Sequence, residues 1–189
     1  MGASWRGLRL LTIGHSTRPV EELAAILGSF GVSILVDVRT IPRSRHNPQF
    51  NSENIEAPLA GKGIRYVHLA KLGGLRHARA HSVNDAWRNA SFRGFADYMQ
   101  TEGFEEGLDE LRVLAGEGTV AIMCAEAVPW RCHRSLVADA ITARGGHVEH
   151  VMGPGHANPH RVTPFAKLEG TRVTYPAEKE DAEGAGSEV

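Results

Sequence analysis

The sequence predicts an α/β fold: a three-layer, Rossmann-like domain whose mostly parallel, five-stranded sheet carries helices on both faces. Two observations predict it. Short apolar runs rich in β-branched residues alternate with stretches of helical periodicity, and turn glycines and prolines separate them. Polar residues also follow the apolar runs repeatedly, as they do where ligands bind at the carboxyl ends of parallel strands.

The first two strands are expected at residues 8–13 and 33–38, because both runs are apolar and end in polar side chains. Between them, Pro19 opens a helical pattern that Gly31 ends. Two glutamates in the first turn of this pattern suit the helix dipole. The start of the chain therefore predicts a strand–helix–strand unit.

The middle of the chain is less regular. Residues 40–51 are rich in Pro, Asn and Ser and are expected to form a loop, followed by a short helix at residues 53–60. A third strand is expected at residues 65–69. Residues 75–94 are polar and basic without a period, so we expect a long loop or short helices that cover the site.

The last part of the domain returns to alternation. Apolar residues recur at helical spacing in residues 95–114, with a break expected at Gly103. A fourth strand is expected at residues 119–124, and a polar loop joins it to a helix that begins near Arg131. A fifth strand is expected at residues 147–152.

Length and composition bound the class of protein. With 189 residues, of which 42% are hydrophobic, the chain suits one α/β domain (residues 1–176) and a disordered acidic tail (residues 177–189). Two cysteines are too few for a disulfide framework, and the first residues contain neither a signal peptide nor an apolar span. We therefore expect a cytoplasmic protein without membrane contact; the sequence does not indicate its oligomeric state.

Both cysteines lie in the strand–loop–helix junction from Thr119 to Arg134. A thiol beside a helix N-terminus and cations has a lowered pKa and is nucleophilic, so Cys124 is the first candidate and its pKa is expected to be depressed. A nearby carboxylate raises a thiol pKa, so Glu126 opposes this effect, and it is itself a candidate general base. Cys132 is either a small buried hydrophobe or a further member of the site.

Parallel strands bring the residues at their carboxyl ends to one edge of the sheet, so His15, Arg39, Cys124, Glu126 and Arg134 are expected to line one pocket. The sequence assigns no metal ligands and no cofactor. The predicted catalytic residues are Cys124, Glu126 and His15, and the predicted substrate-binding residues are Ser16, Asp37, Arg39, Arg45, Arg131, His133 and Arg134.

The net charge of −1 hides a segregation of charge. Residues 39–93 hold ten Lys and Arg against three acidic residues, a balance of +7, whereas the last nineteen residues hold two against five, a balance of −3. A basic middle segment predicts an anionic partner, either a small molecule or a nucleic acid.

Three functions fit these residues. The first is an enzyme, a hydrolase or transferase that uses Cys124 or Glu126 on a phosphate-, nucleotide- or sulfur-containing anion. The second is a nucleic-acid-binding module in which Trp87, Phe92 and Tyr66 stack bases among the cations of residues 39–93.

The third function is a metal site made of Cys124, Cys132, His133 and Glu126. It ranks last, because seven residues separate the two cysteines and structural zinc sites use closely spaced pairs.

Several motifs together resemble one family. They are Thr12-Ile13-Gly14-His15-Ser16, Asp37-Val38-Arg39 with Pro42 and Ser44-Arg45, Leu72-Gly73-Gly74, Cys124-Ala125-Glu126 and Cys132-His133-Arg134. This set is similar to that of the domain-of-unknown-function 488 family, and the resemblance extends over about residues 8–176. It implies an α/β domain with a polar site and does not specify a reaction.

A looser similarity is to rhodanese-like and cysteine-phosphatase domains, in which an Asp-x-Arg strand precedes a loop that begins with Cys and ends with Arg. Asp37 to Arg39 and Cys124 to Arg131 follow this order. The loop, however, has no glycine and carries Glu126 and Pro129 where an anion cradle needs bare N–H groups. Because of these differences, sulfur or phosphoryl transfer through a Cys124 thiolate is one hypothesis among others and is not a direct consequence of the similarity.

Overall fold

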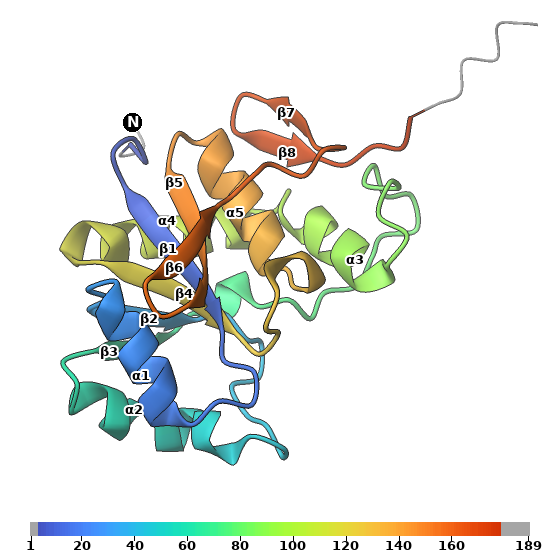
Figure 1. The fold of residues 1–189 in the computed structure, drawn as a ribbon. Helices are drawn as coiled ribbons and strands as arrows, with labels where there is room; N and C mark the ends of the chain where they lie inside the picture. The colour runs from blue at the N-terminus through green and yellow to red at the C-terminus, as the bar shows by residue number, and fades with distance from the viewer. Residues whose placement is uncertain (1–3, 179–189) are drawn as a thin grey trace, which may run out of the picture.

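The computed structural model describes residues 4–178, and strands alternate with helices along the chain as predicted (Figure 1). The strands are β1 (Arg9–Gly14), β2 (Ile34–Asp37), β3 (Arg65–His68), β4 (Val120–Cys124), β5 (His147–Gly153), β6 (His156–Pro159), β7 (Lys167–Glu169) and β8 (Arg172–Thr174). The α-helices are α1 (Val20–Ser29), α2 (Ser52–Ala60), α3 (Ala90–Tyr98), α4 (Glu102–Glu117) and α5 (Arg134–Ala143). Short 3₁₀ turns lie at Pro48–Phe50, Ala70–Leu72 and Pro129–Arg131.

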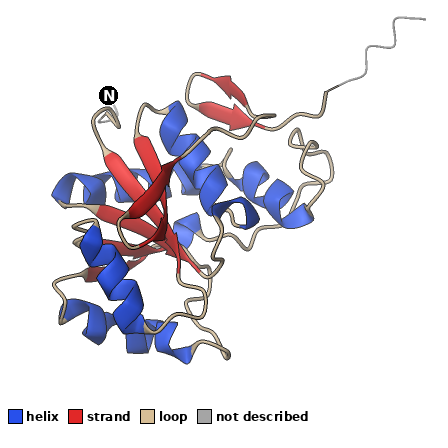
Figure 2. Cartoon of the chain, viewed as in Figure 1, coloured by secondary structure: helices blue, strands red, loops and turns tan. Residues whose placement is uncertain are grey.

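The central sheet has the strand order β3-β2-β4-β1-β5-β6. All pairings among the first five of these strands are parallel, which confirms the mostly parallel α/β fold. The sheet has one strand more than predicted, because β6 turns back and pairs antiparallel with β5. The sequence prediction also missed the separate antiparallel pair β7–β8, which lies beside α5 (Figure 2).

The strand β4 lies at the centre of the sheet and contributes side chains to the hydrophobic cores on both of its faces. All five of its residues are buried, so the strand is apolar throughout. Val120, Ile122 and Cys124 pack in the core shared with α3, α4 and α5. Ala121 and Met123 pack in the core shared with α1 and α2. Successive side chains of β4 thus point into two separate hydrophobic cores, and helices cover both faces of the sheet.

The helical region predicted for residues 95–114 is two helices. The break falls at Thr101, earlier than the predicted Gly103, because the Thr101 side chain caps α4 by accepting a hydrogen bond from the backbone N–H of Phe104. Similarly, Asn89 accepts hydrogen bonds from the N–H groups of Ser91 and Phe92 and caps α3. The predicted long loop therefore ends at Asn89.

Buried Asp97 of α3 holds this loop against the domain. Its carboxylate accepts hydrogen bonds from the Arg79 N–H at 2.8 Å, from the Ser82 hydroxyl at 2.5 Å and from the Asn84 amide at 2.8 Å. These bonds satisfy a carboxylate that would be costly to bury alone. The loop is thereby fixed near the carboxyl ends of the strands.

Near the C-terminal end of the chain, the predicted tail begins at Ala177, whose N–H donates to Asp85 of the loop before α3 at 2.6 Å. The tail beyond Glu178 lies outside the described residues. Among residues 4–178, no helix is both long enough and apolar enough to cross a membrane.

Candidate functional site

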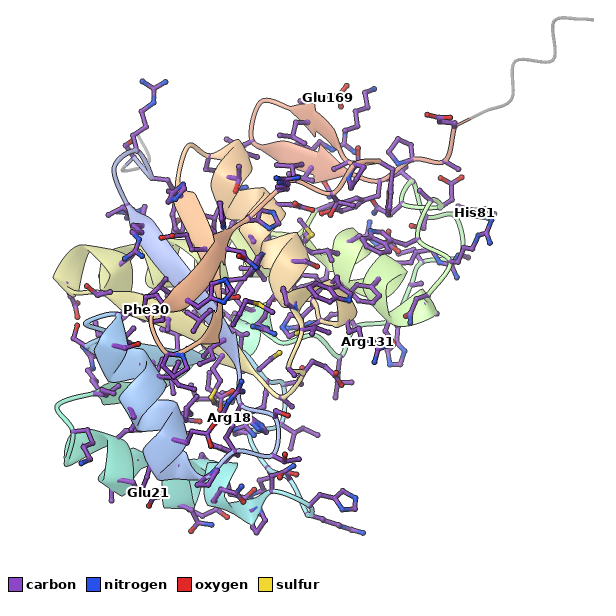
Figure 3. The ribbon with its side chains drawn as sticks, in the orientation of Figure 1. Arg18, Glu21, Phe30, His81, Arg131 and Glu169 are labelled. Carbon is purple, nitrogen blue, oxygen red and sulfur yellow. The ribbon has the colours of Figure 1, made fainter. Side chains whose placement is uncertain are left out.

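A cavity of about 500 Å³ lies where β1, β2 and β4 end. Parallel strands direct their carboxyl ends to this edge, and the loop that follows β4 forms part of the wall. Arg131 lies on this loop (Figure 3). The lining residues are His15, Arg39, Thr40, Ile41, Arg43, Ser44, Gly74, Leu75, Asn89, Ser91, Phe92, Cys124, Ala125, Glu126, Arg131, Cys132 and His133.

Gly14 allows the end of β1 to approach the loop after β4. A Cβ atom on Gly14 would lie 1.7 Å from the carbonyl oxygen of Glu126, so no other residue fits here without moving the backbone. The next two residues continue the contact: the N–H of His15 donates to Cys124 O at 2.9 Å, and the N–H of Ser16 donates to Ala125 O at 3.0 Å. These bonds fix the loop that carries the reactive residues.

Asp37 and Arg39 form a buried ion pair at the end of β2. The Arg39 Nη2 donates to Asp37 Oδ2 at 2.6 Å, and its Nε donates to Asp37 Oδ1 at 2.9 Å. The hydroxyl of Tyr66 donates to the same carboxylate at 2.6 Å. Asp37 is fully buried and therefore orients Arg39, whose Nη1 faces His15 at 3.3 Å.

His15 is held as a neutral imidazole. Its Nδ1 lies 2.7 Å from the carbonyl oxygen of Ser16, which can only accept, so Nδ1 carries the proton and Nε2 accepts from Arg39. The ring stacks on Phe50 with 4.2 Å between centroids. Burial lowers the pKa of His15 from 6.5 to about 4, so the ring is uncharged at neutral pH.

The two cysteines lie together at the floor of the cavity. The sulfurs of Cys124, at the end of β4, and Cys132, just before α5, are 2.6 Å apart, and both thiols are free. The backbone N–H of Arg134 points at the Cys132 sulfur at 3.5 Å, and His133 Nδ1 lies 3.6 Å from it. Cys132 is therefore the sulfur toward which the surrounding donors converge.

The second nitrogen of His133 defines the state of this ring. Nε2 lies 2.9 Å from the carbonyl oxygen of Leu72 and 3.1 Å from that of Val38, so it carries a proton. In the neutral ring, Nδ1 is then free to accept the thiol proton of Cys132. Gly74 makes room for the ring, because a Cβ atom there would lie 2.6 Å from His133 Nδ1.

Arg134 lies behind the cysteines and is 1% exposed. Its guanidinium donates to Glu126 O at 2.7 Å and to Thr12 Oγ1 at 3.2 Å, and its Nε has no hydrogen-bond partner among the described residues. Within residues 4–178, no carboxylate forms an ion pair with Arg134, so its charge is free to stabilise an anion on the neighbouring sulfurs.

A hydrogen-bonded chain extends from Thr12 away from the cavity. The Thr12 hydroxyl lies 2.7 Å from His150 Nδ1, and His150 Nε2 lies 2.9 Å from His160 Nδ1. His160 Nε2 then donates to Asp139 Oδ1 at 2.7 Å. Burial lowers the pKa of His150 to about 4, so this ring is neutral beside Arg134. The Thr12 hydroxyl can then donate to His150, and its oxygen accepts a hydrogen bond from Arg134.

The predicted low pKa of Cys124 is wrong. Burial raises the pKa of the Cys124 thiol well above its usual range, and the hydrogen bond to Cys132 adds to this. Burial also raises the pKa of Cys132, but its hydrogen bonds with Cys124 and His133 outweigh burial and hold the pKa well below its usual range. The two thiols titrate as a pair, and the backbone N–H of Arg134 and the ring of His133 beside Cys132 favour the negative charge on that sulfur.

The predicted site residues divide into three groups. Those that line the cavity are His15, Arg39, Cys124, Glu126, Arg131 and His133. Asp37 and Arg134 instead lie beneath it, because each is buried in hydrogen bonds that hold other members of the site. Arg45 is exposed outside the cavity, and Ser16 contributes backbone groups to the loop contact.

Other residues of the cavity were not predicted. Arg43 lines it in place of Arg45, and Ile41, Leu75 and Phe92 supply an apolar wall. Nothing in the local sequence distinguishes these four residues. Cys132 was identifiable as a site residue, since it directly precedes a histidine at a helix start.

Fold and site together define an α/β protein with a two-cysteine pocket at the carboxyl edge of a parallel sheet. A sequence profile described as "Domain of unknown function DUF488" matches residues 19–141, which is more than half of the chain. The chain belongs to this family. Comparison with curated proteins and with solved structures gave no match.

Proposed function

We propose that this protein is an enzyme that attacks a small anionic substrate with the thiolate of Cys132. The observation that carries the proposal is the convergence of donors on one sulfur. Cys124 lies 2.6 Å from Cys132 Sγ, the Arg134 N–H 3.5 Å and His133 Nδ1 3.6 Å. A thiolate is the nucleophilic form of cysteine, and hydrogen bonds to the charged form favour it.

The neighbours of Cys132 have separate roles in this proposal. His133 accepts the thiol proton at Nδ1, because the carbonyl groups that hold Nε2 fix the ring in the required tautomer. The buried charge of Arg134 stabilises the thiolate. Neutral His15 orients Arg39 and, with a pKa of about 4, is not an acid at neutral pH.

The walls of the cavity indicate the kind of substrate. Arg43 and Arg131 are exposed at its rim, and Arg131 has no ion-pair partner among residues 4–178. Ile41 and Leu75 are exposed apolar residues of the same cavity, with 60% and 68% of their surfaces accessible. A molecule with an anionic end and a short apolar part fits such a wall.

Glu126 is the alternative catalytic residue. Its side chain is exposed, and the described residues give it no hydrogen bond or ion pair, whereas its backbone carbonyl holds Arg134. A catalytic base is normally oriented by a neighbouring group. The surroundings of the thiols therefore support a thiol mechanism better than a Glu126 mechanism.

The nucleic-acid hypothesis has less support. Trp87 stacks on Phe92 with 4.8 Å between ring centroids, and the Tyr66 hydroxyl binds Asp37, so these aromatic residues are engaged within the domain. Lys71 of the basic segment forms ion pairs with two glutamates of α4. For the metal hypothesis, the part of the chain that the structure describes contains no group of three or more His, Cys, Asp or Glu placed to hold an ion.

The test compares two alkylating agents, neutral iodoacetamide and anionic iodoacetate, with mass spectrometry to assign the labelled cysteine. We expect Cys132 to react first at pH 7 and the rate ratio of iodoacetate to iodoacetamide to exceed that of free cysteine. Exposed arginines attract the anionic reagent, so Arg131→Gln lowers the ratio and Glu126→Gln raises it.

Arg6→Gln, before β1, is a matched control, since this arginine is exposed like Arg131 and does not line the cavity. The proposal fails if Cys132 reacts no faster than a free thiol at pH 7, or if the ratio of the two rates equals that of free cysteine in every variant.

A further inference from the structure

We infer that Cys124 and Cys132 act as a catalytic dithiol, and that the group on which the site acts is the disulfide bond of a small anionic molecule. The inference rests on the proposed function, because it needs Cys132 as the attacking thiolate. It adds a role for Cys124, a chemical class for the substrate and a second product.

The positions of the sulfurs are the first support. Cys124 is the last residue of β4, and Cys132 lies between the 3₁₀ turn Pro129–Arg131 and His133, the N-cap of α5. Their separation of 2.6 Å is closer than two non-bonded sulfurs normally pack. Both also line the same cavity. The two sulfurs therefore need to approach only slightly further to form a bond.

The different surroundings of the sulfurs are the second support. The Cys132 sulfur accepts from the Arg134 N–H and faces His133. Among the described residues, the hydrogen-bond partners of Cys124 Sγ are Cys132 and the Glu126 carbonyl oxygen, at 3.9 Å. Dithiol enzymes need one thiolate that attacks and one protonated thiol that attacks later. The geometry provides this asymmetry, with Cys132 first and Cys124 second.

The adjacent second thiol also limits the substrate. If Cys132 carried a carbon- or phosphorus-linked group, attack by Cys124 on that group would only move it from one sulfur to the other. If Cys132 carries a sulfur-linked group, Cys124 can attack the Cys132 sulfur itself and release the group as a thiol. A protonated thiol in contact with the nucleophile is therefore useful for a disulfide substrate.

The reaction has two balanced steps. In the first, the Cys132 thiolate attacks the substrate disulfide R–S–S–R, a Cys132–S–S–R bond forms, and one R–S⁻ leaves and takes up the proton held by His133. In the second, the Cys124 sulfur attacks Cys132 Sγ, the bond to the substrate breaks, and the second R–S⁻ takes up the proton that Cys124 loses. The substrate disulfide is reduced to two thiols and the protein dithiol is oxidised to a disulfide. A thiol reductant from solution restores the dithiol.

The charge of the cavity rim selects the disulfide. Arg43 and Arg131 face the solvent at the cavity, and Glu126 is the only carboxylate among the lining residues. Arg43 also pairs with Glu53 at 3.6 Å, so Arg131 carries most of the selection. Disulfides with carboxylate arms should therefore react faster than disulfides of the same length with ammonium arms. Steering by a few charges changes association rates by about tenfold or more.

The experiment incubates the reduced full-length protein with 3,3′-dithiodipropionate, which is anionic, or with cystamine, which is cationic. Released thiol and the mass of the protein are measured over time. We expect two equivalents of mercaptopropionate per protein, loss of both protein thiols without a lasting adduct, and a rate about tenfold above that with cystamine. Dithiothreitol should restore both thiols.

Two single-cysteine variants separate the steps. Cys124→Ala should release one equivalent of thiol and retain one mercaptopropionate on Cys132. Cys132→Ala should react no faster than a buried free thiol. If the unaltered protein stops at the mixed disulfide, or if the two disulfides react at equal rates, the inference is overturned.

The outcome also separates this inference from the proposed function. Fast alkylation of Cys132 without closure of the Cys124–Cys132 bond contradicts the dithiol and leaves the thiolate enzyme standing. Slow alkylation of Cys132 at pH 7 contradicts both.

Discussion

Replacing Cys124 tests how the pair shares its charge. Two donors face the Cys132 sulfur, the Cys124 thiol at 2.6 Å and the Arg134 N–H at 3.5 Å. His133 Nδ1, at 3.6 Å, becomes a donor only after it has accepted the thiol proton. Cys124→Ala removes the nearest donor and leaves Arg134 and His133 in place. A hydrogen bond to a charged group contributes about 1.5–3 kcal/mol, and a thiol is a weak donor, so the lower value applies. Since one pKa unit corresponds to about 1.4 kcal/mol, the pKa of Cys132 should rise by about one unit.

The absorbance of the thiolate near 240 nm measures this shift during a pH titration. The chain has only two cysteines, so the variant has one titrating thiol. Cys124→Ser is the matched control, because its hydroxyl is similar in size to the thiol and is the stronger donor. In this control the pKa of Cys132 should remain as low as in the unaltered protein.

Two results would refute the reasoning. The first is an equal pKa of Cys132 in Cys124→Ala and Cys124→Ser, which would show that the hydrogen bond from residue 124 does not stabilise the thiolate. The second is an ordinary or low pKa of Cys124 in the Cys132→Ser variant, which would show that the negative charge resides on Cys124.

Three further predictions concern stability. Burial lowers the pKa of His15 and of His150 from 6.5 to about 4. As the pH falls, these histidines therefore bind protons in the unfolded chain before they do so in the folded protein. Stability that is present above pH 6.5 is lost as the pH falls toward 4. Near pH 5 the free energy of unfolding, measured by urea denaturation, should fall by about 1.4 kcal/mol per pH unit for each histidine, and His150→Gln should halve this slope. Gly14→Ala places a Cβ 1.7 Å from the Glu126 carbonyl oxygen, so we expect a loss of about 3 kcal/mol and a melting temperature lower by roughly 6–12 °C; an unchanged calorimetric melting temperature would show that the loop can move. Asp37→Asn leaves a buried arginine without its carboxylate and should destabilise the protein by about 3–5 kcal/mol, whereas a near-neutral result in chemical denaturation would mean that water or another group replaces the carboxylate.

The order of strands and helices could be predicted from the sequence, since each element has a local pattern. An apolar run buried on both faces marks β4, and a proline with acidic residues behind it marks the start of α1. The antiparallel strand β6 and the pair β7–β8 could not be predicted. These strands are three or four residues long, and most of their residues are exposed, so they lack the apolar alternation that marks a strand.

The candidate site was predicted in part. Reactive side chains follow several of the predicted strands, and parallel strands end at one edge of a sheet. This pattern predicted that His15, Arg39 and Cys124 line one pocket, and all three line the cavity. The sequence also indicated an electropositive thiol, but it assigned the low pKa to the wrong sulfur. The reason is that burial and hydrogen-bond partners set a thiol pKa, and neither is a property of residue spacing.

The α/β class, the edge of the sheet that carries the site and most of the side chains there could be predicted from local patterns and from the direction of parallel strands. The packing of the whole chain sets which of these side chains line the cavity and which support it from below. It brought Cys124 and Cys132 to 2.6 Å across seven intervening residues and set His133 between Cys132 and two carbonyl groups from distant parts of the chain. Distances between segments far apart in sequence depend on how whole elements pack. That packing gives Cys132 the Arg134 N–H and His133 as neighbours and leaves Cys124 without them, although both thiols are buried.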